Sequence, residues 1–368
     1  MHQTYVLHVL APARQGGLER VVSMLATEQR AAGVHVAAVL QPHEASDHPF
    51  IASLRGADIP VTTIEVGSKH YYKEYSALRG VISRLSPSIV HTHGYRADIV
   101  GGIAARRCRV PVVSTVHGFT GGSWRNRMNE KLQLLALRRC SATIAVSRPL
   151  VERLTAAGVS PPRIYLVPNA IATPTSLSRV EARRKLGLSE TQPVAGWVGR
   201  LSHEKGPDVM LKALALSDSD WQLSLIGDGP ERSSLRRLAD EEGIASRATF
   251  HGEVANAASF MNAFDALVIS SRTEGTPISL LEAMSLGVPI VATDVGGIPD
   301  VVSDSEAIIV RPEDPRAIAA ALSEARSNVM ATRKRVEAAR SRVRTYHSIQ
   351  RWIDAIAAAY ESALSSRS

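Results

Sequence analysis

Apolar and polar positions follow two different periodicities along this chain, and the two periodicities alternate. Short runs rich in Val, Ile and Leu predict buried strands, and amphipathic stretches such as LERVVSMLATEQRAAG (18–33) predict helices between them. In the first half the strand-like runs are YVLHVL, HVAAVL, VTTIEV, SIVHTH, VPVVSTV and ATIAVS. Strands that alternate with helices in this way indicate βαβ units and a buried parallel sheet.

A stretch with neither periodicity separates the two halves. RIYLVPNAIATPTSLS (163–178) is rich in proline and small polar residues, which predicts a hinge. The alternation then resumes with VAGWVGRL, WQLSLIGDG, ATFHGEV, ALVIS, PIVATDV and AIIV. We therefore predict an α/β fold of two Rossmann-like, doubly wound domains, residues 1–168 and 169–345. The carboxyl ends of both sheets are expected to face an interdomain cleft, where ligands bind.

The C-terminal segment 346–368 has the pattern of an amphipathic helix. Its apolar positions at helical spacing are Ile349, Trp352, Ile353, Ile356 and Tyr360. Arg351 is its only Lys or Arg before residue 365, which argues against a membrane-surface helix. We predict that this helix packs back toward the N-terminal domain.

Composition agrees with two globular domains and also indicates in which cellular compartment the protein is expected. The 368 residues exceed what one ordinary core serves, and no run of about 18 apolar residues occurs. The N-terminal residues lack the pattern of a signal peptide. Cys108 and Cys140 have no metal or redox spacing and are expected to be free thiols. The expected location is the cytoplasm.

The net charge of +8 is unevenly distributed. Residues 1–168 hold 20 Lys or Arg against 10 Asp or Glu, a net of +10, and residues 169–368 hold 23 against 25, a net of −2. A basic first half favours an anionic partner, such as a phosphorylated substrate, a membrane surface or nucleic acid. A surface that only keeps the protein in solution is the alternative. With 5% aromatic residues and no recognised module, nucleic acid is not expected as a partner.

Two motifs of the first half have both a functional and an ordinary interpretation. Gly16 and Gly17 follow a predicted strand and open a helix, where backbone amides can approach a phosphate; a plain tight turn explains them equally well. His91 and His93 form an H-x-H pair, but no third ligand is evident nearby, so we predict no metal site.

Two cations mark the second half. In GWVGRLSHEKGPDVML (196–211), Arg200 follows a strand, and Lys205 precedes a Gly-Pro pair and a new helix. Cations at the carboxyl end of a strand suit a diphosphate, with Arg supplying a fork of donors and Lys a point charge. Two exposed loop cations are the alternative.

The segment TEGTPISLLEAMSLG (273–287) combines an anion site with two carboxylates. Pro277 suits a first helical turn and Gly287 a C-terminal cap, which predicts a helix over 277–286. Its free amides near Ile278 and Ser279 can bind an anion. Glu274 precedes them and can accept hydrogen bonds from hydroxyls. Glu282 either binds a ribose diol from the helix or is a solvated helix position.

Taken together, these motifs resemble a known family. The E-x7-E pair, the Arg/Lys loop at 200–205, GGLE (16–19), VPNAI (167–171) and LGVPIVATDVGGIPD (286–300) are similar to the retaining GT-B glycosyltransferases of family 4. The resemblance covers nearly the whole chain in the family's order. It implies that a nucleotide-diphosphate sugar, linked to UDP or GDP, binds mainly to the second domain.

The resemblance also implies roles for individual residues. Arg200 and Lys205 would hold the diphosphate, and Glu282 the ribose hydroxyls. Glu274, with the backbone around Thr276, Ile278 and Ser279, would meet the sugar and the distal phosphate.

Further roles concern the base and the first domain. Gly252 and Val254 would lie against the base, Gly16 and Gly17 would close over the phosphates, and His117 matches the family's active-site histidine. The chain departs from the family at Thr276-Pro277, where many members have Phe-Gly, and this affects the pattern that recognises the sugar.

In the implied reaction the configuration at the sugar's anomeric carbon is retained as the nucleoside diphosphate leaves. Arg200, Lys205 and the predicted helix start would stabilise the negative charge on the departing phosphate. With cations in place of a metal, no cofactor is expected, and Mg²⁺ is not strictly needed. His117 and Glu274 would orient the sugar.

The acceptor follows from charge and family together. The basic first half would receive an anionic glycan or lipid-linked acceptor at the cytoplasmic membrane face, in cell-surface polysaccharide or glycolipid synthesis. Segment 124–140 has five Lys or Arg to one Glu, with Leu132, Leu135 and Leu137. It forms either a membrane-surface helix or an ordinary amphipathic helix with its leucines inward. Alternative functions are a nucleotide-sugar 2-epimerase of the same fold and a non-catalytic nucleotide-sugar-binding protein.

Overall fold

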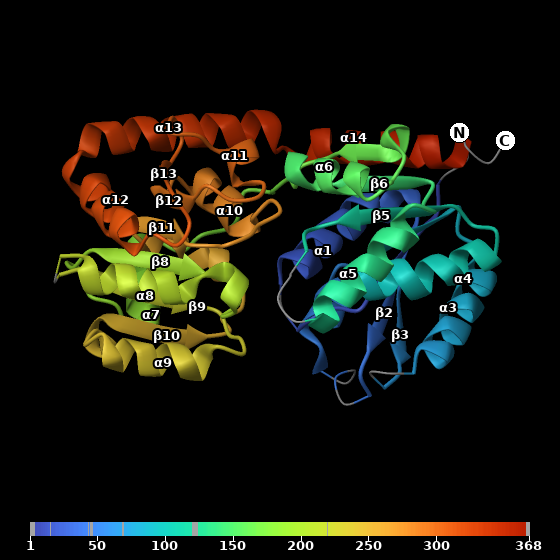
Figure 1. Ribbon diagram of the computed structural model, residues 1–368, viewed down its shortest axis with the longest axis horizontal. Coiled ribbons are helices and arrows are strands. Elements are labelled where there is room, and N and C mark those ends of the chain that lie inside the picture. The colour runs from blue at the N-terminus through green and yellow to red at the C-terminus, as the bar shows by residue number, and fades with distance from the viewer. Residues whose placement is uncertain are drawn as a thin grey trace. The chain divides into compact units, whose positions relative to one another are not determined.

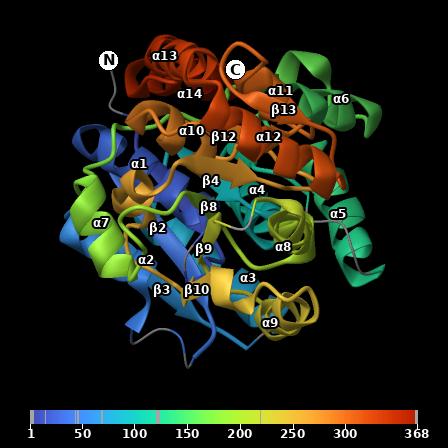
Figure 2. The same ribbon diagram turned by 90° about the vertical axis from the view of Figure 1, so that its left-hand side faces the viewer.

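Two compact units make up the structure, a computed structural model that describes residues 4–14, 16–42, 44, 47–67, 70–119, 124–218 and 220–365. Unit 1 comprises Met1–Asn169 and Gln350–Ser368, and unit 2 comprises Ala170–Ile349. Each unit has a parallel sheet with helices around it, and the strands of each can be followed in Figures 1 and 2. The predicted α/β fold with two Rossmann-like domains is confirmed.

Unit 1 contains a seven-stranded sheet in the order β3-β2-β1-β4-β5-β6-β7. Its strands are β1 (Val6–Leu10), β2 (Val34–Leu40), β3 (Val61–Glu65), β4 (Ile89–His93), β5 (Val112–Val116), β6 (Ala142–Ala145) and β7 (Ile164–Leu166). Its helices are α1 (Gly17–Gln29), α2 (Pro49–Gly56), α3 (Tyr71–Leu85), a π-helix (Ala97–Gly101) continued by α4 (Gly102–Arg107), α5 (Trp124–Leu137), α6 (Arg148–Ala156) and α14 (Ile349–Ser365), with short 3₁₀ turns at Arg30–Ala32 and Pro161–Arg163.

Both faces of the unit 1 sheet are buried, as a doubly wound fold requires. Alternate residues of β2 enter two different cores: Val36 packs with α1 and α2, whereas Ala37 packs with α3 and α4. Two-sided burial explains why this strand reads as a continuous apolar run.

Unit 2 has a six-stranded sheet in the order β10-β9-β8-β11-β12-β13. Its strands are β8 (Val194–Val198), β9 (Gln222–Ile226), β10 (Ala248–Gly252), β11 (Ala266–Ile269), β12 (Ile290–Thr293) and β13 (Ile308–Val310). Its helices are α7 (Arg179–Leu186), α8 (Pro207–Leu216), α9 (Arg232–Glu241), α10 (Ile278–Leu286), α11 (Ile298–Val301), α12 (Pro315–Ser327) and α13 (Val329–Tyr346), with 3₁₀ turns at His203–Lys205, Ala245–Arg247 and Ala257–Ala263.

Sequence signals fix several helix ends in unit 2. Ser178 accepts a hydrogen bond from the backbone N–H of Glu181, whose carboxylate accepts one in return from the Ser178 backbone, and this capping box starts α7. Gly287 ends α10 with φ +74°, a left-handed conformation that favours glycine. The predicted cap of that helix is therefore confirmed.

The predicted hinge is only partly irregular. Ile164–Leu166 form β7, which pairs with β6 and adds a seventh strand to unit 1, so the start of the hinge was assigned wrongly. The predicted tail helix begins at Ile349, because residues up to Tyr346 continue α13. Trp352, Ile356 and Tyr360 of α14 are buried, and Tyr360 bonds to residues of α1 and β4.

Among the described residues, no helix is both long and apolar enough to cross a membrane.

Candidate active site

The central strands of unit 2 end where the strand order reverses. β8 and β11 are neighbours, but their connections run to opposite sides of the sheet, and ligands of doubly wound folds bind at such a point. The loop after β8 carries Arg200 and Lys205, and the loop after β11 carries Glu274 and leads into α10. The topology therefore brings together the two motifs that the sequence singled out in this half.

Backbone packing holds these two loops against each other. Gly206 has φ +62°, and a Cβ there would lie 2.1 Å from the carbonyl oxygen of Ser270. The Ser270 hydroxyl donates to the Gly206 carbonyl at 2.7 Å and accepts from the Trp197 indole at 3.1 Å. Only glycine fits this approach, so the position of Lys205 is fixed by its neighbour.

Lys205 and Glu274 form a close ion pair at this edge. Lys205 Nζ lies 2.7 Å from both carboxylate oxygens of Glu274, and the Ser271 hydroxyl donates to Glu274 Oε1 at 2.7 Å. The Glu274 side chain is 6% exposed, and that of Lys205 is 31% exposed. The carboxylate is thus shielded and neutralised, while the ammonium group keeps access to an arriving anion.

Two arginines near this pair differ in their bonding: Arg200 has no side-chain partner among the described residues, and Arg272 has several. Arg200 is exposed, and no hydrogen bond or ion pair of its guanidinium to the described residues is found. Arg272 instead donates to both Asp208 oxygens at 2.8 Å and pairs with Glu313. It also donates to the His203 carbonyl at 2.7 Å, so it braces the turn that carries Lys205. Sequence reasoning missed Arg272, because its partners are distant in the chain.

The start of α10 is open to an anion. Pro277 is the N-cap, one position outside the predicted helix start, and no side chain caps the first turn. Thr276 and Ile278 are buried, and Ser279 is half-buried. Helix N-terminal amides beside a lysine favour a bound phosphate.

The second carboxylate of the E-x7-E pair is inside the protein. Glu282 is 2% exposed, so its interpretation as a solvated helix position is wrong. The loop LGVPIVATDVGGIPD supports the first carboxylate instead: Gly297 N–H donates to the Glu274 carbonyl at 3.2 Å. A Cβ on Gly296 would lie 2.0 Å from that carbonyl oxygen, which explains the glycine there.

The residues predicted to meet the base lie at the end of β10. Gly252 has φ +73°, and its carbonyl accepts from Gly227 N–H, after β9, at 2.8 Å. Val254 lies two residues further on, outside any strand or helix, and is half-buried. Both therefore lie at the carboxyl edge of the same sheet as Lys205, two strands away from β8.

The predicted residues of unit 1 lie at the carboxyl ends of its central strands. Gly16 precedes and Gly17 begins α1, after β1, and Glu19 of this first turn accepts from Ala13 N–H at 2.8 Å. His117 follows β5, is half-buried, and lies 3.2 Å from His93 through their Nε2 and Nδ1 atoms. Desolvation lowers the pKa of His117 to about 4.

The H-x-H pair has a third imidazole beside it, contrary to the sequence-based expectation. The sheet register pairs His8 of β1 with His91 of β4, and nitrogen atoms of His8, His91 and His93 lie within 4.8 Å of one another. Imidazole nitrogens are common metal ligands, so these three form a candidate metal-ligating set. Sequence reasoning missed His8 because it stands inside an apolar strand, far from the pair along the chain.

The helix α5 has an exposed apolar stripe. Trp124, Met128, Leu132 and Leu135 are between 45% and 66% exposed, at spacings of four and three residues that place them on one side of a helix. Leu137 is buried, so of the three leucines named from the sequence only this one is in the core.

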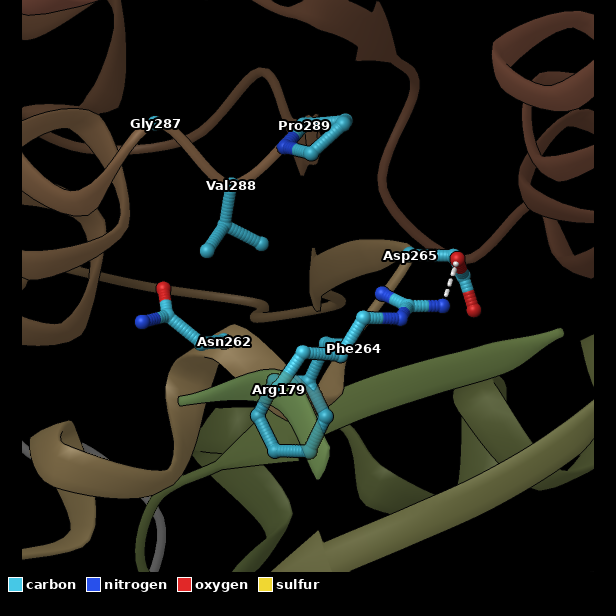
Figure 3. A pocket seen from close by; sticks show the side chains of 7 residues that line it. All are labelled: Arg179, Asn262, Phe264, Asp265, Gly287, Val288 and Pro289. Carbon is cyan, nitrogen blue, oxygen red and sulfur yellow. Dashed lines mark hydrogen bonds and ion pairs between the residues drawn. The ribbon is translucent and has the colours of Figure 1, made fainter. Parts of the chain in front are cut away.

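A shallow hollow of about 380 Å³ lies elsewhere in unit 2 (Figure 3). Asp265 precedes β11 and Pro289 precedes β12, so the hollow is at the amino ends of the strands. Arg179 pairs with Asp265 there at 2.6 Å. The hollow is therefore separate from the carboxyl edge that carries the candidate site.

Two family matches agree with the geometry of the two units. Residues 178–342 match the family described as glycosyl transferases group 1, and residues 15–174 match glycosyltransferase family 4. The chain belongs to the group 1 glycosyltransferases of the GT-B fold.

Individual relatives support this class. A 2-deoxystreptamine N-acetyl-D-glucosaminyltransferase of Streptomyces fradiae is 30% identical over 69% of this chain and 66% of its own length. A lipopolysaccharide core biosynthesis mannosyltransferase of Rhizobium meliloti is 34% identical over 50% of this chain and 56% of its own. The matched part of the chain thus spans roughly three fifths of the length of these curated relatives.

A solved structure shares the fold over almost the full length. Anabaena HepE in complex with UDP-glucose superposes with a TM-score of 0.87 and 21% identity, over 97% of this chain and 99% of that one.

Proposed function

We propose that the protein is a retaining hexosyltransferase. It transfers a hexose or N-acetylhexosamine from a UDP- or GDP-linked sugar to an anionic glycan or lipid-linked acceptor, in cell-surface polysaccharide or glycolipid synthesis at the cytoplasmic face of a membrane. The observation that carries this proposal is the shielded Lys205–Glu274 pair beside the uncapped start of α10. Relatives named for sugar transfer, and a structural neighbour solved with UDP-glucose, support the donor class.

In this proposal Lys205 exchanges partners when the donor binds. Its ammonium group turns from the Glu274 carboxylate to the diphosphate, where Arg200 and the first amides of α10 also act. The Glu274 carboxylate then loses its bond to Lys205 but keeps the hydrogen bond from the Ser271 hydroxyl. It becomes available to accept hydrogen bonds from hydroxyls of the sugar. In the absence of the donor, the Glu274 carboxylate thereby occupies the position on Lys205 that the diphosphate takes when it binds.

The chemistry is the departure of the nucleoside diphosphate from the anomeric carbon. Positive charge grows on the sugar ring while negative charge grows on the leaving phosphate, where the cations stabilise it. The leaving phosphate oxygen takes the proton of the acceptor hydroxyl on the same face, which retains configuration. Arg200 and Lys205 supply charge that a metal ion would otherwise provide, so Mg²⁺ is not strictly required. His117 orients the sugar from unit 1, Gly16 and Gly17 approach the phosphates, and Glu282 binds the ribose.

The α5 stripe favours a membrane surface as the place of the acceptor. Its apolar side chains are exposed, and Arg125, Arg127 and Lys131 on the same helix are exposed too. Exposed aromatic and aliphatic side chains beside cations suit an anionic lipid interface.

Flotation with liposomes tests this membrane contact. Binding is expected to liposomes that contain phosphatidylglycerol, not to pure phosphatidylcholine, and to be lost in Trp124→Ser/Leu132→Ser. The matched control Leu216→Ser changes an exposed leucine of unit 2 and should float like the wild type. Equal flotation of both variants removes α5 from the proposal.

A donor screen tests the reaction itself. UDP- and GDP-linked hexoses and N-acetylhexosamines are incubated with the protein, and the released nucleotide and the recovered sugar are measured. Transfer, or slow hydrolysis, supports the proposal. Conversion to an epimeric nucleotide sugar would identify a 2-epimerase, and binding without any turnover a nucleotide-sugar-binding protein.

A further inference from the structure

Seven side chains form one continuous hydrogen-bonded chain inside unit 1. In order along the chain of bonds they are Thr115, His91, Tyr360, Gln29, His8, His93 and His117. They belong to β5, β4, α14, α1, β1, β4 and the residue directly after β5. The chain of bonds therefore links the C-terminal helix to the candidate active-site histidine.

The first half of the network surrounds the Tyr360 hydroxyl. His91 lies between Thr115 Oγ1, 2.7 Å from its Nε2, and Tyr360 Oη, 2.7 Å from its Nδ1. Gln29 donates to the same Tyr360 oxygen at 3.1 Å. His91 is fully buried and Tyr360 is 7% exposed, so the two bonds of His91 are shielded from water, and the bond from the half-buried Gln29 is partly so.

The second half leads from Gln29 to His117. Gln29 Oε1 lies 2.7 Å from His8 Nε2, and His8 Nδ1 lies 2.9 Å from His93 Nε2. His93 Nδ1 then lies 3.2 Å from His117 Nε2. Every ring contributes both of its nitrogens except the last, whose Nδ1 has no hydrogen-bond partner among the described residues.

Burial keeps these imidazoles neutral. It lowers the pKa of His8 and of His117 to about 4, and it lowers the pKa values of His91 and His93 well below 6.5. A neutral imidazole has one N–H donor and one bare acceptor nitrogen. If one ring nitrogen donates a hydrogen bond, the other must accept one. The tautomer of one histidine therefore determines the tautomer of the next histidine in the chain of bonds.

The Gln29 amide sets the direction. Its nitrogen donates to Tyr360, so its oxygen faces His8 and can only accept. His8 must then carry its hydrogen on Nε2, which makes its Nδ1 an acceptor for His93 Nε2–H. By the same step His93 Nδ1 accepts from His117 Nε2–H. His117 is left with a bare Nδ1.

We propose that this network fixes the tautomer of His117, and that Tyr360 and Gln29 act as positioning residues for it. The link to turnover rests on the proposed function: a bare Nδ1 accepts a hydrogen bond from a hydroxyl of the sugar or the acceptor. Reversing the Gln29 amide would reverse every proton in the chain and turn Nδ1 into a donor.

The same rings fit this network better than a metal site. His91 and His93 have ring centroids 4.3 Å apart and planes tilted by 30°. Both nitrogens of His8, His91 and His93 already have partners in the chain of bonds. Metal binding would have to break several of these bonds.

Histidine tautomers can be read directly by ¹⁵N NMR of the full chain with labelled histidine. In the wild type we expect His117 to show a protonated Nε2 and an unprotonated Nδ1. Tyr360→Phe and Gln29→Leu each remove the element that selects the direction, so the His117 nitrogens should shift toward an average of both tautomers. Tyr72→Phe, which removes the hydroxyl of an 81% exposed tyrosine, is the matched control.

Turnover of the donor found in the screen is the second readout. Both network variants should lose about tenfold in kcat, less than the roughly 100-fold or more that loss of a positioned acid–base group costs, because His117 itself remains, while UDP affinity is unchanged. An unchanged His117 tautomer in both variants would overturn the proposal, as would a protonated Nδ1 in the wild type or stoichiometric zinc in the purified protein. Full activity of His117→Ala alongside responsive tautomers would refute the proposed role of His117 in transfer and leave the network standing.

Discussion

The two units differ in the polar groups that are buried in and just after their central strands. Unit 2 retains charge there: the Glu274 carboxylate, 6% exposed, is paired with the Lys205 ammonium group at 2.7 Å. Unit 1 also has an ion pair after β4, between Glu74 and Arg96 at 2.7 Å. It differs in the four linked imidazoles of β1, β4 and the residue after β5, whose pKa values are all lowered by burial. An ion pair can be exchanged for a charged ligand, whereas a neutral network holds a fixed geometry. Under the proposed function, unit 2 would bind the anionic part of the donor and unit 1 would orient the sugar.

The sharpest way to break the comparison is to remove the charge in unit 2. Glu274→Gln keeps the shape of the side chain but cannot balance Lys205 or a growing positive charge on the sugar. We expect turnover to fall about 100-fold or more, with the fold intact. Steady-state kinetics on the identified donor measures it. Glu313→Gln, a 58% exposed carboxylate at the other end of the Arg272 bridge, is the control and should keep most activity.

The next largest expected effect is that a fall in pH destabilises unit 1 before unit 2. An imidazole whose folded pKa is about 4, below the unfolded value near 6.5, lowers stability as pH falls from 6.5 to 4, because the unfolded state then binds more protons. His8 and His117 each contribute on the order of 3 kcal/mol over this window. Asp98, with its pKa raised to about 6, acts in the opposite sense and offsets one of them.

Hydrogen exchange resolved by peptide can measure this acid effect for each unit. We expect protection of β4 and β5, relative to the intrinsic exchange rate, to fall between pH 6.5 and pH 4.5 before that of β8 and β11. Equal loss in both sheets would contradict the neutral-network account of unit 1.

A smaller effect is expected at the buried carboxyl group of unit 1. Asp98 is fully buried and accepts from Thr92 at 2.5 Å, Ser114 at 2.7 Å and Gln133 at 2.7 Å. Asp98→Asn places an amide donor against one of these donors, and we expect a loss of about 2 kcal/mol in the free energy of unfolding. Urea denaturation measures it, and an unchanged midpoint would refute this account of Asp98.

The smallest effect concerns a helix cap far from either site. Ser178→Ala removes the capping box of α7, and we expect about 1 kcal/mol of destabilisation without loss of turnover. A thermal unfolding scan checks it. A reduced kcat in this variant would contradict the expectation that the α7 cap affects only stability.

The fold could be predicted from the sequence because buried parallel strands leave a strong signal. Both faces of β2 are covered, so HVAAVL reads as an unbroken apolar run. β7 was missed because its three residues stand in a proline-rich segment, where pairing with β6 overrides local preference. Helix α10 was within one residue of its prediction, since Pro277 and Gly287 are strong local signals.

The candidate site was predictable where its residues fall in one motif and not where they meet through the fold. Glu274 and Lys205 could each be selected from local sequence, but their direct pairing depends on the adjacency of β8 and β11. Arg272 could not be selected, because its partners Asp208 and Glu313 come from distant segments. His8 joined the histidine cluster only through the register of β1 with β4.

The central claim is that Lys205 is the cation that exchanges Glu274 for the donor diphosphate. Titration calorimetry with UDP and GDP on the wild type and on Lys205→Ala tests it most directly, with Lys212→Ala, an exposed lysine of the next helix, as the control. We predict that Lys205→Ala binds the preferred nucleotide at least about tenfold more weakly, with an unchanged circular dichroism spectrum, and that the control binds normally. Equal affinity in wild type and Lys205→Ala would contradict the account.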